Sequence, residues 1–376
     1  MPLETLEFRT SLQKLLIALI LILVPLTVLG FYVALQGDTH ARQINGENFR
    51  ALSRTAANAT SDFIADSVRD IGLVANSPQA MQVVNAAKTK YEGLSEDAIR
   101  AKIDATEQSW QNFQSDGLSE SSLTSDLARQ LRRTRELKPT LLKITISDIT
   151  GATVAATERP VHYFQTDRTM WMALASQGLG AIHVSDLRYD DESRLCYLSI
   201  AYPILQEGTG RFMGAVTSMV DASAILAQLN RTEMGRTGRM SLVREDGTVI
   251  ESPGITPGMN LKSEEYAAIR DALGSPRGRD AGYLFANLGN GKPYLIGFSD
   301  TGLKEAYPNL SWFVLASQEA NELIGPVRIM TGFALLLMVV ALLMLSLLAA
   351  YVFLHQRQEL EDIEPHDEDR VHPIAA

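Results

Sequence analysis

Two long runs of apolar residues lie near the two ends of the chain. One covers residues 15–35 and the other residues 329–354, and neither contains a charged residue. A helix of about 20 apolar residues can cross the hydrocarbon core of a bilayer, where only a helix or a closed barrel satisfies the backbone polar groups. The pattern therefore predicts membrane-spanning helices over residues 15–35 and 326–354, with the rest of the chain between them.

After the first run, small and apolar residues recur every three or four positions, which is typical of a helix with one apolar face. The residues of this stripe are Phe49, Leu52, Ala56, Ala59 and Phe63 and, shifted by one position, Ile64, Val68, Ile71 and Ala75. We interpret residues 36–138 as a long stalk helix followed by a further helical segment. The apolar face either packs against its own chain or forms the seam of a homodimer, and the pattern allows both.

The period of the pattern changes near residue 139. In residues 142–157, alternating runs rich in Ile, Thr and Val flank an Asp-Ile-Thr-Gly turn, which predicts a β-hairpin. A polar loop, a short helix and two or three more strands are predicted as far as residue 221, and a last helix ends near residue 230.

The same order of elements returns in residues 231–325, so we call residues 139–230 the first repeat and residues 231–325 the second repeat. The pairs that match are Ile144 and Met240, Ile146 and Leu242, Gly151 and Gly247, Val154 and Ile250, residues 197–201 and 294–298, and residues 212–216 and 311–315. Because an internal repeat implies one structural unit used twice, we predict two similar α+β units, each an antiparallel sheet with helices on one face.

Composition excludes several classes of function. The chain has 376 residues, a net charge of −10 and no concentrated basic patch, so we expect no nucleic-acid partner. Cys196 is the only cysteine, which excludes an intrachain disulfide and argues against cysteine-rich metal sites. No catalytic arrangement or metal-ligand spacing stands out, and we interpret His162 and His183 as surface or hydrogen-bonded histidines. We therefore expect no enzyme, no cofactor and no metal.

A long helix next to the membrane, two tandem hairpin-led units and a closing apolar span resemble the double Cache (dCache) sensor domains of bacterial receptors. The likeness covers about residues 44–321. Residues 163–171 look like the helix that caps the ligand pocket in that family, and residues 185–193 with 199–204 look like the strand pair that lines it. The resemblance implies an α+β fold with two tandem PAS-like Cache units along a long N-terminal helix, flanked by two transmembrane helices.

The resemblance also places the ligand in the first repeat, which it makes the membrane-distal unit. A site for a small polar molecule needs an aromatic wall and a few placed charges. Trp171 and Tyr189 can supply the wall, Arg168 can bind a carboxylate, and nearby acids can accept hydrogen bonds from an ammonium group. Trp171 could equally be a core residue, and the acidic run could be a solvated hairpin tip. The expected ligand-binding residues are Tyr163, Asp167, Arg168, Trp171, Asp186, Tyr189, Asp190 and Tyr197.

The chain departs from the amino-acid-binding members of that family at three positions. The resemblance leads us to expect Arg at position 169, Tyr at position 172 and Asp at position 219. The chain has Thr169, Met172 and Met219 instead. We therefore expect a ligand other than an ordinary amino acid. The identity of the ligand, and whether the pocket is occupied at all, stay open at this point.

Together with the patterns above, this resemblance implies a two-pass protein of the cytoplasmic (inner) membrane that senses a small organic molecule. Residues 1–14 and the acidic tail, residues 355–376, are expected in the cytoplasm, and the central part is expected in the periplasm or outside the cell, as in the family. Since no kinase, cyclase or methyl-accepting module follows the second span, we expect a separate signalling protein, such as a kinase, a cyclase or a chemotaxis component. The alternative is an accessory or structural membrane protein whose Cache-like units bind another protein.

Overall fold

The structure is a computed structural model that describes residues 3–112, 117–165, 174, 181–190, 192–232, 234–255, 258–274 and 280–361. The chain divides into two compact parts. One consists of Met1–Asn45 with Ala320–Ala376, and the other of Gly46–Glu319.

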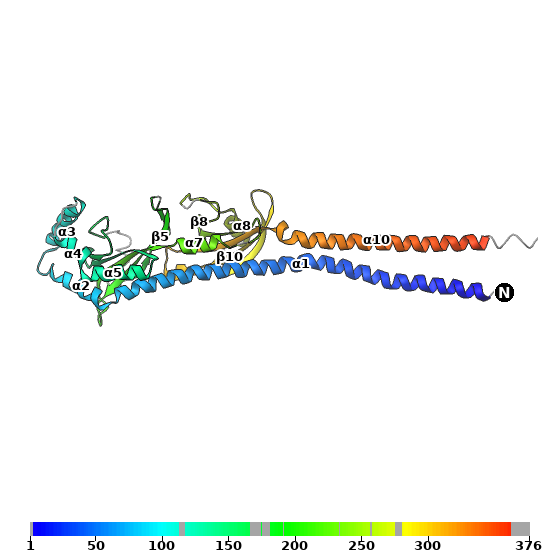
Figure 1. Ribbon diagram of the computed structural model, residues 1–376, viewed down its shortest axis with the longest axis horizontal. Coiled ribbons are helices and arrows are strands. Elements are labelled where there is room, and N and C mark those ends of the chain that lie inside the picture. The colour runs from blue at the N-terminus through cyan, green and yellow to red at the C-terminus, as the bar shows by residue number, and fades with distance from the viewer. Residues whose placement is uncertain are drawn as a thin grey trace, which may run out of the picture. The chain divides into compact units, whose positions relative to one another are not determined.

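The first part contains the N-terminal portion of helix α1 (Leu3–Ala75) and helix α10 (Ala320–Glu361) (Figure 1). Among the described residues, Ala320–Leu348 is the one helical stretch found to be long and apolar enough to cross a membrane. Residues 15–35 are helical as predicted, because they lie inside α1. Whether they span a membrane stays a prediction.

Helices α1 and α10 contact each other within this part. A Cβ atom at Gly30 would meet the side chain of Met338, and Nε of Arg328 donates a hydrogen bond to Oδ1 of Asp38 at 3.0 Å. As the residue number rises along α1, the number of its partner on α10 falls, so the two helices run antiparallel.

The second part begins with the rest of α1 and four shorter helices. These are α2 (Pro78–Thr89), α3 (Glu96–Gln111), α4 (Gly117–Thr124) and α5 (Asp126–Leu137). Ser77, Ser95 and Ser125 precede α2, α3 and α5, and each accepts a hydrogen bond from the backbone N–H three residues later. These serines satisfy N–H groups that have no partner inside the helix, which explains where the three helices begin.

The first repeat forms a six-stranded antiparallel sheet. Its elements are β1 (Leu141–Asp148), β2 (Thr153–Ala156), β3 (His183–Val184), β4 (Arg188–Asp190), β5 (Leu195–Leu205), β6 (Phe212–Asp221) and helix α7 (Ser223–Asn230). The strand order is β2-β1-β6-β5-β3, and β4 also pairs with β5. Gly151 adopts a φ of 88° in the turn between β1 and β2, a conformation that glycine adopts without steric cost, so the predicted hairpin is confirmed.

The second repeat forms a five-stranded antiparallel sheet of the same topology. Its elements are β7 (Arg239–Arg244), β8 (Val249–Glu251), α8 (Glu264–Leu273), β9 (Ala281–Asn287), β10 (Pro293–Asp300), α9 (Leu303–Ala306) and β11 (Trp312–Glu319). The order β8-β7-β11-β10-β9 corresponds strand for strand to that of the first sheet. The predicted duplication and the α+β class are therefore confirmed.

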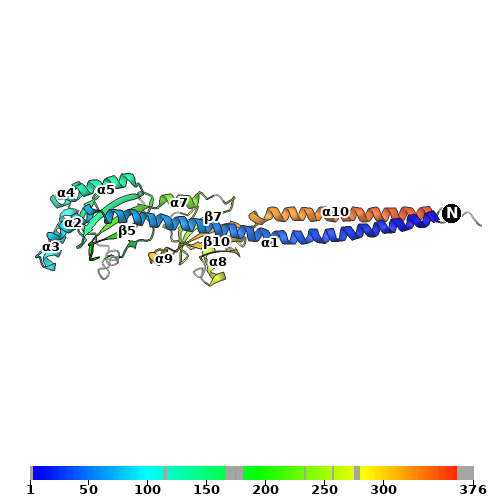
Figure 2. The same ribbon diagram turned by 90° about the horizontal axis from the view of Figure 1, so that it is seen from below.

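Helix α1 lies along both sheets, as two perpendicular views show (Figures 1 and 2). Its side chains Phe49, Ile64 and Ile71 are buried, and the backbone of Phe49 passes so close to Gly297 of β10 that a Cβ atom there would clash. Of the two interpretations of the apolar stripe, packing against its own chain is the one seen for these residues.

Strand pairing shows which residues of the two repeats are equivalent. One row across three strands consists of Thr145, Thr217 and Ala201 in the first repeat, and of Ser241, Leu315 and Phe298 in the second. The predicted matches on β1 with β7 and on β5 with β10 agree with these rows. The match of residues 212–216 with 311–315 is wrong by one position, because Ala215, and not Gly214, is equivalent to Phe313.

Candidate functional site

A cavity of about 640 Å³ lies on one face of the first sheet. Its floor comes from strands β1 and β6, and its walls come from helix α3 and the loop of residues 160–165. The lining residues are Glu107, Gln111, Lys143, Thr145, Pro160, Val161, His162, Phe164, Gln165, Thr217 and Met219. The volume lies within the range of small-molecule sites, about 300–1,000 Å³.

Strand alternation places four side chains on the floor of the cavity. Lys143 pairs with Met219 across the sheet, and Thr145 pairs with Thr217. Because successive side chains of a strand point to opposite faces, Ile144 enters the core while Lys143 and Thr145 face the cavity. In the part of the chain that the structure describes, the hydroxyl groups of Thr145 and Thr217 bind no other protein group, so a bound molecule can use them.

The α3 wall carries a carboxylate whose bonds hold the loop in place. Glu107 accepts hydrogen bonds from Nε2 of Gln111 at 2.8 Å and from the backbone N–H of Phe164 at 2.9 Å, and Nδ1 of His162 lies 3.0 Å from it. Burial raises the pKa of Glu107, but the hydrogen bonds from Gln111, Phe164 and His162 outweigh burial, so the pKa falls below its usual range. This carboxylate is therefore ionised at neutral pH.

Lys143 brings a positive charge to the floor. Its Nζ lies 2.8 Å from Oε1 of Glu158, in the segment after β2, and about half of its side chain is exposed. An ammonium group has three donors, so the pair with Glu158 leaves Lys143 able to donate to a second acceptor.

A small aromatic cluster supports the loop from behind. The rings of Tyr163 and Trp110 are 5.5 Å apart, and Nε1 of Trp110 donates a hydrogen bond of 2.9 Å to the backbone oxygen of Pro160. Tyr163, predicted to bind ligand, is buried in this cluster with Trp110 and Ala152 and does not line the cavity.

The structure places Asp186 and Tyr189 at the contact between the two repeats. Oδ2 of Asp186 lies 2.5 Å from Nε of Arg244 on β7, and Oδ1 accepts a hydrogen bond of 3.0 Å from the indole N–H of Trp312 on β11. Tyr189 approaches Gly258 of the second repeat. These two predicted ligand residues therefore link the sheets to each other.

Two other predicted residues are not among the described residues that line the cavity. Asp190 is partly exposed at the end of β4, where hydrogen bonds from the side chain and backbone of Ser193 lower its pKa. Tyr197 lies on β5, paired with Arg188 and Asp221. Asp167, Arg168 and Trp171 lie outside the described residues, and their roles stay predictions.

The sequence interpretation missed most of the cavity. Glu107 and Gln111 belong to a helix whose pattern looks like a solvated surface, and nothing local distinguishes them. Lys143 and Thr145 could have been found, because they are the polar alternates to the apolar positions of β1. Within the described residues, no three His, Cys, Asp or Glu side chains gather as a metal ion would require.

Comparisons with known proteins agree with this architecture. A family model described as a Cache domain, of the dCache type, matches residues 39–327. A search of curated protein sequences finds no match to the chain.

Several solved structures resemble the chain. One is the sensory domain of the Campylobacter jejuni chemoreceptor Tlp3 (CcmL) with isoleucine bound, at 10% identity and a TM-score of 0.50, covering 76% of this chain and 97% of that one. A second crystal structure of the Tlp3 (CcmL) sensory domain gives 11% identity, a TM-score of 0.50, and coverage of 76% of this chain and 98% of that one. The ligand-binding domain of the Pseudomonas aeruginosa PAO1 chemoreceptor PctC with GABA gives 15% identity, a TM-score of 0.47, and coverage of 72% and 97%.

Proposed function

The chain belongs to the Cache domain family, and on that premise we propose that it is a membrane-anchored sensor that binds a small organic molecule in the cavity of its first repeat. The Tlp3 sensory domain, which shares the fold, holds isoleucine, so this fold can accommodate a ligand of that size.

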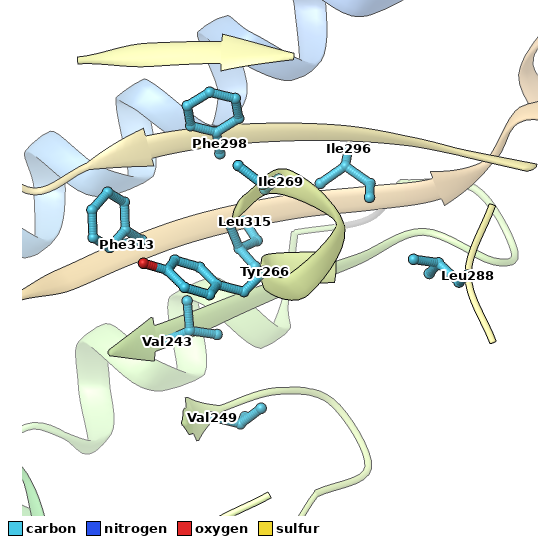
Figure 3. Packing of buried hydrophobic residues seen from close by; sticks show 9 residues of the cluster. All are labelled: Val243, Val249, Tyr266, Ile269, Leu288, Ile296, Phe298, Phe313 and Leu315. Atoms are coloured by element: carbon cyan, nitrogen blue, oxygen red, sulfur yellow. The ribbon is translucent and has the colours of Figure 1, made fainter. Parts of the chain in front are cut away.

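One observation carries the proposal, namely that the two repeats place side chains of different size on equivalent faces. The equivalent pairs are Ser199 and Ile296, Ala201 and Phe298, Ala215 and Phe313, and Thr217 and Leu315. In the second repeat the large members pack under Tyr266 and Ile269 of α8 (Figure 3). In the first repeat the small members leave room, part of which Leu174 fills against Ala201 and Ala215. Thr217, another small member, lines the cavity together with Thr145 beside it on β1.

We further propose that the protein crosses the membrane twice. The apolar run of α1 lies beside the apolar stretch of α10, through the contacts of Gly30 with Met338 and of Asp38 with Arg328. Two apolar helices in antiparallel contact are what a two-pass protein needs. Residues 1–14 and 355–376 then lie in the cytoplasm, and the Cache units lie in the periplasm or outside the cell.

The signal travels through this helix pair to a signalling module or partner, such as a kinase, a cyclase or a chemotaxis component. A ligand shifts a two-state balance only by its difference in affinity for the two states. The cavity lies between the sheet and the loop of residues 160–165, so a ligand that contacts both more closely in one state than in the other supplies such a difference.

A thermal-shift screen of the full chain in lipid nanodiscs tests the proposal. Binding to the folded state raises stability, by about 2.7 kcal/mol at a ligand concentration of 100 times Kd. Thr217→Leu, which introduces the residue of the second repeat at this position, fills the floor of the cavity and should abolish the shift. Thr209→Leu, in the exposed β5–β6 turn, is the matched control and should leave it intact.

Two results would contradict the proposal that a ligand binds in this cavity. One is the absence of any stabilising compound in a broad metabolite library, which favours a protein-binding role instead. The other is a shift that persists in Thr217→Leu, which locates the ligand elsewhere.

A further inference from the structure

The second repeat holds a carboxylate of its own on the face that is equivalent to the cavity floor. Glu265 of α8 is only 5% exposed. It accepts a hydrogen bond of 2.7 Å from Nε of Arg239, one of 3.2 Å from the hydroxyl of Ser317, and one of 2.9 Å from the hydroxyl of Ser263. A buried carboxylate is tolerated when a cation and hydrogen-bond donors compensate it, as they do here.

The first repeat carries a cation at the equivalent position. Arg239 pairs with Ser317 across β7 and β11, and Lys143 pairs with Met219 across β1 and β6. These two pairs occupy the same place in the two sheets, two residues along from the row that contains Thr145 and Ser241 and therefore on the same face. Lys143 therefore stands where Arg239 stands, beside an open cavity instead of a packed helix.

We propose that the ligand of the first repeat is a monocarboxylate whose carboxylate group binds Nζ of Lys143. This inference rests on the proposed sensor function and names the class of molecule that the sensor detects. The ligand carboxylate takes the place that the side chain of Glu265 holds in the second repeat. Charge-assisted hydrogen bonds to a carboxylate are among the stronger polar interactions in proteins, and here they fix the orientation of the ligand.

The other lining groups define the rest of the molecule. The hydroxyl groups of Thr145 and Thr217 lie on the same floor and donate to the carboxylate or to a neighbouring oxygen of the ligand. Met219 and Phe164 offer apolar surface to its body. The ionised carboxylate of Glu107 on the α3 wall repels a second negative charge, which is why one carboxylate is favoured over two.

Isothermal titration calorimetry of the full chain in nanodiscs tests this class of ligand. The probes are sodium propionate, isovalerate, L-lactate and benzoate, each compared with its primary amide and with an amine of similar size, and sodium succinate serves as the dianion. At least one monocarboxylate should bind, at least tenfold more tightly than its amide, and succinate should bind more weakly than that monocarboxylate.

Variants of Lys143 separate a bound charge from a general effect on folding. Lys143→Met should weaken binding of the monocarboxylate about tenfold to hundredfold, because a charged hydrogen bond is lost. Lys143→Arg keeps the charge and should retain binding within a few-fold. Glu158→Gln removes the competing acid and should leave affinity unchanged or higher. Lys262→Met, at an exposed ion pair of the second repeat, should bind as the unchanged chain does.

The outcomes distinguish this inference from the sensor function on which it rests. If an amide, an amine or succinate binds most tightly, or if Lys143→Met binds the monocarboxylate normally, the monocarboxylate assignment is wrong and the sensor stands. If no compound of the broad metabolite library binds the chain, both are wrong.

Discussion

The two repeats share strand order, register and hairpin turns, yet one face is filled in the second repeat and open in the first. In the second repeat Phe298, Phe313 and Leu315 meet the side chains of α8, and an ion pair between the buried Glu265 and the partly exposed Arg239 completes the contact. In the first repeat the equivalent strands carry alanine, serine and threonine, and a lysine faces a cavity.

This difference teaches that topology alone does not decide which repeat has a cavity on this face. The backbone provides the same platform twice, and side-chain volume on one face decides between a core and a site. The second repeat can then act as a rigid support, since a close-packed face resists rearrangement, whereas the first repeat can respond to what enters it.

The largest expected loss of stability follows from removing one of the large side chains in the core of the second repeat. Phe313 is 1% exposed and its ring packs against that of Tyr266. Phe313→Ala should lower the free energy of unfolding by about 3–5 kcal/mol, as large-to-small core substitutions do. Urea unfolding of the full chain in nanodiscs, followed by circular dichroism, measures this loss.

Thr217→Ala is the counterpart in the first repeat and should cost less than about 1 kcal/mol, because the side chain borders the cavity. Equal losses in the two variants would mean that both faces are packed cores, and the comparison between the repeats would fail.

Most of the fold could be predicted from the sequence because its signals are local. The alternation of residues 142–157, and the glycine at position 151, identify a hairpin without any knowledge of the rest of the chain. The duplication followed from comparing two such hairpins. The comparison failed only where β6 was aligned with β11, and there by one residue. A one-residue slip in the alignment moves every side chain to the opposite face. It therefore concealed that the small Ala215 of the first repeat is equivalent to the large Phe313 of the second.

The candidate site was harder to predict because it depends on contacts between distant segments. Glu107 and Phe164 lie far apart in the sequence and meet only when α3 folds over the loop. Asp186 and Tyr189 have the chemistry of ligand-binding residues, and the structure uses them between the repeats. Residue type indicates what a side chain can bind, and the fold decides which partner it meets.

A loss of stability of intermediate size is expected when the contact between the two repeats is weakened. Asp186→Ala removes the ion pair with Arg244 and leaves the buried indole N–H of Trp312 without its acceptor. The loss should be about 1–3 kcal/mol, the usual cost of an unsatisfied buried donor. Hydrogen exchange followed by mass spectrometry should show faster exchange in β7 and β11.

Asp190→Ala is the matched control, since it removes a partly exposed acid of the same predicted site at the end of β4. It should change stability by less than about 0.5 kcal/mol. If Asp190→Ala destabilised the chain as much as Asp186→Ala, Asp186 would have no special role in joining the sheets.

The smallest expected effect concerns the acids at the hairpin turns, whose pKa values move in opposite directions in the two repeats. In the second repeat the hydrogen bond from Lys262 lowers the pKa of Asp246 to about 2. In the first repeat burial raises the pKa of Asp148, although Thr150 and Ala152 donate hydrogen bonds to it.

These shifts give opposite contributions to stability as the pH changes. The contribution of Asp246 is present above its unfolded pKa, about 3.8, and is lost as the pH falls toward 2. Asp148 binds its proton more tightly in the folded chain, so its contribution is present below about 3.8 and is lost as the pH rises through its folded pKa. Urea midpoints measured at a series of pH values between 2 and 6 test both contributions. As the pH falls below 3.8, Asp246→Asn should lose stability less steeply than the unchanged chain does. As the pH falls toward 3.8 from above, the protonation of Asp148 stabilises the unchanged chain, and Asp148→Asn should lack this gain in stability. If both variants shifted the pH dependence in the same direction, the two turns would be electrostatically alike, and the contrast between the repeats would be confined to the packing of their sheets.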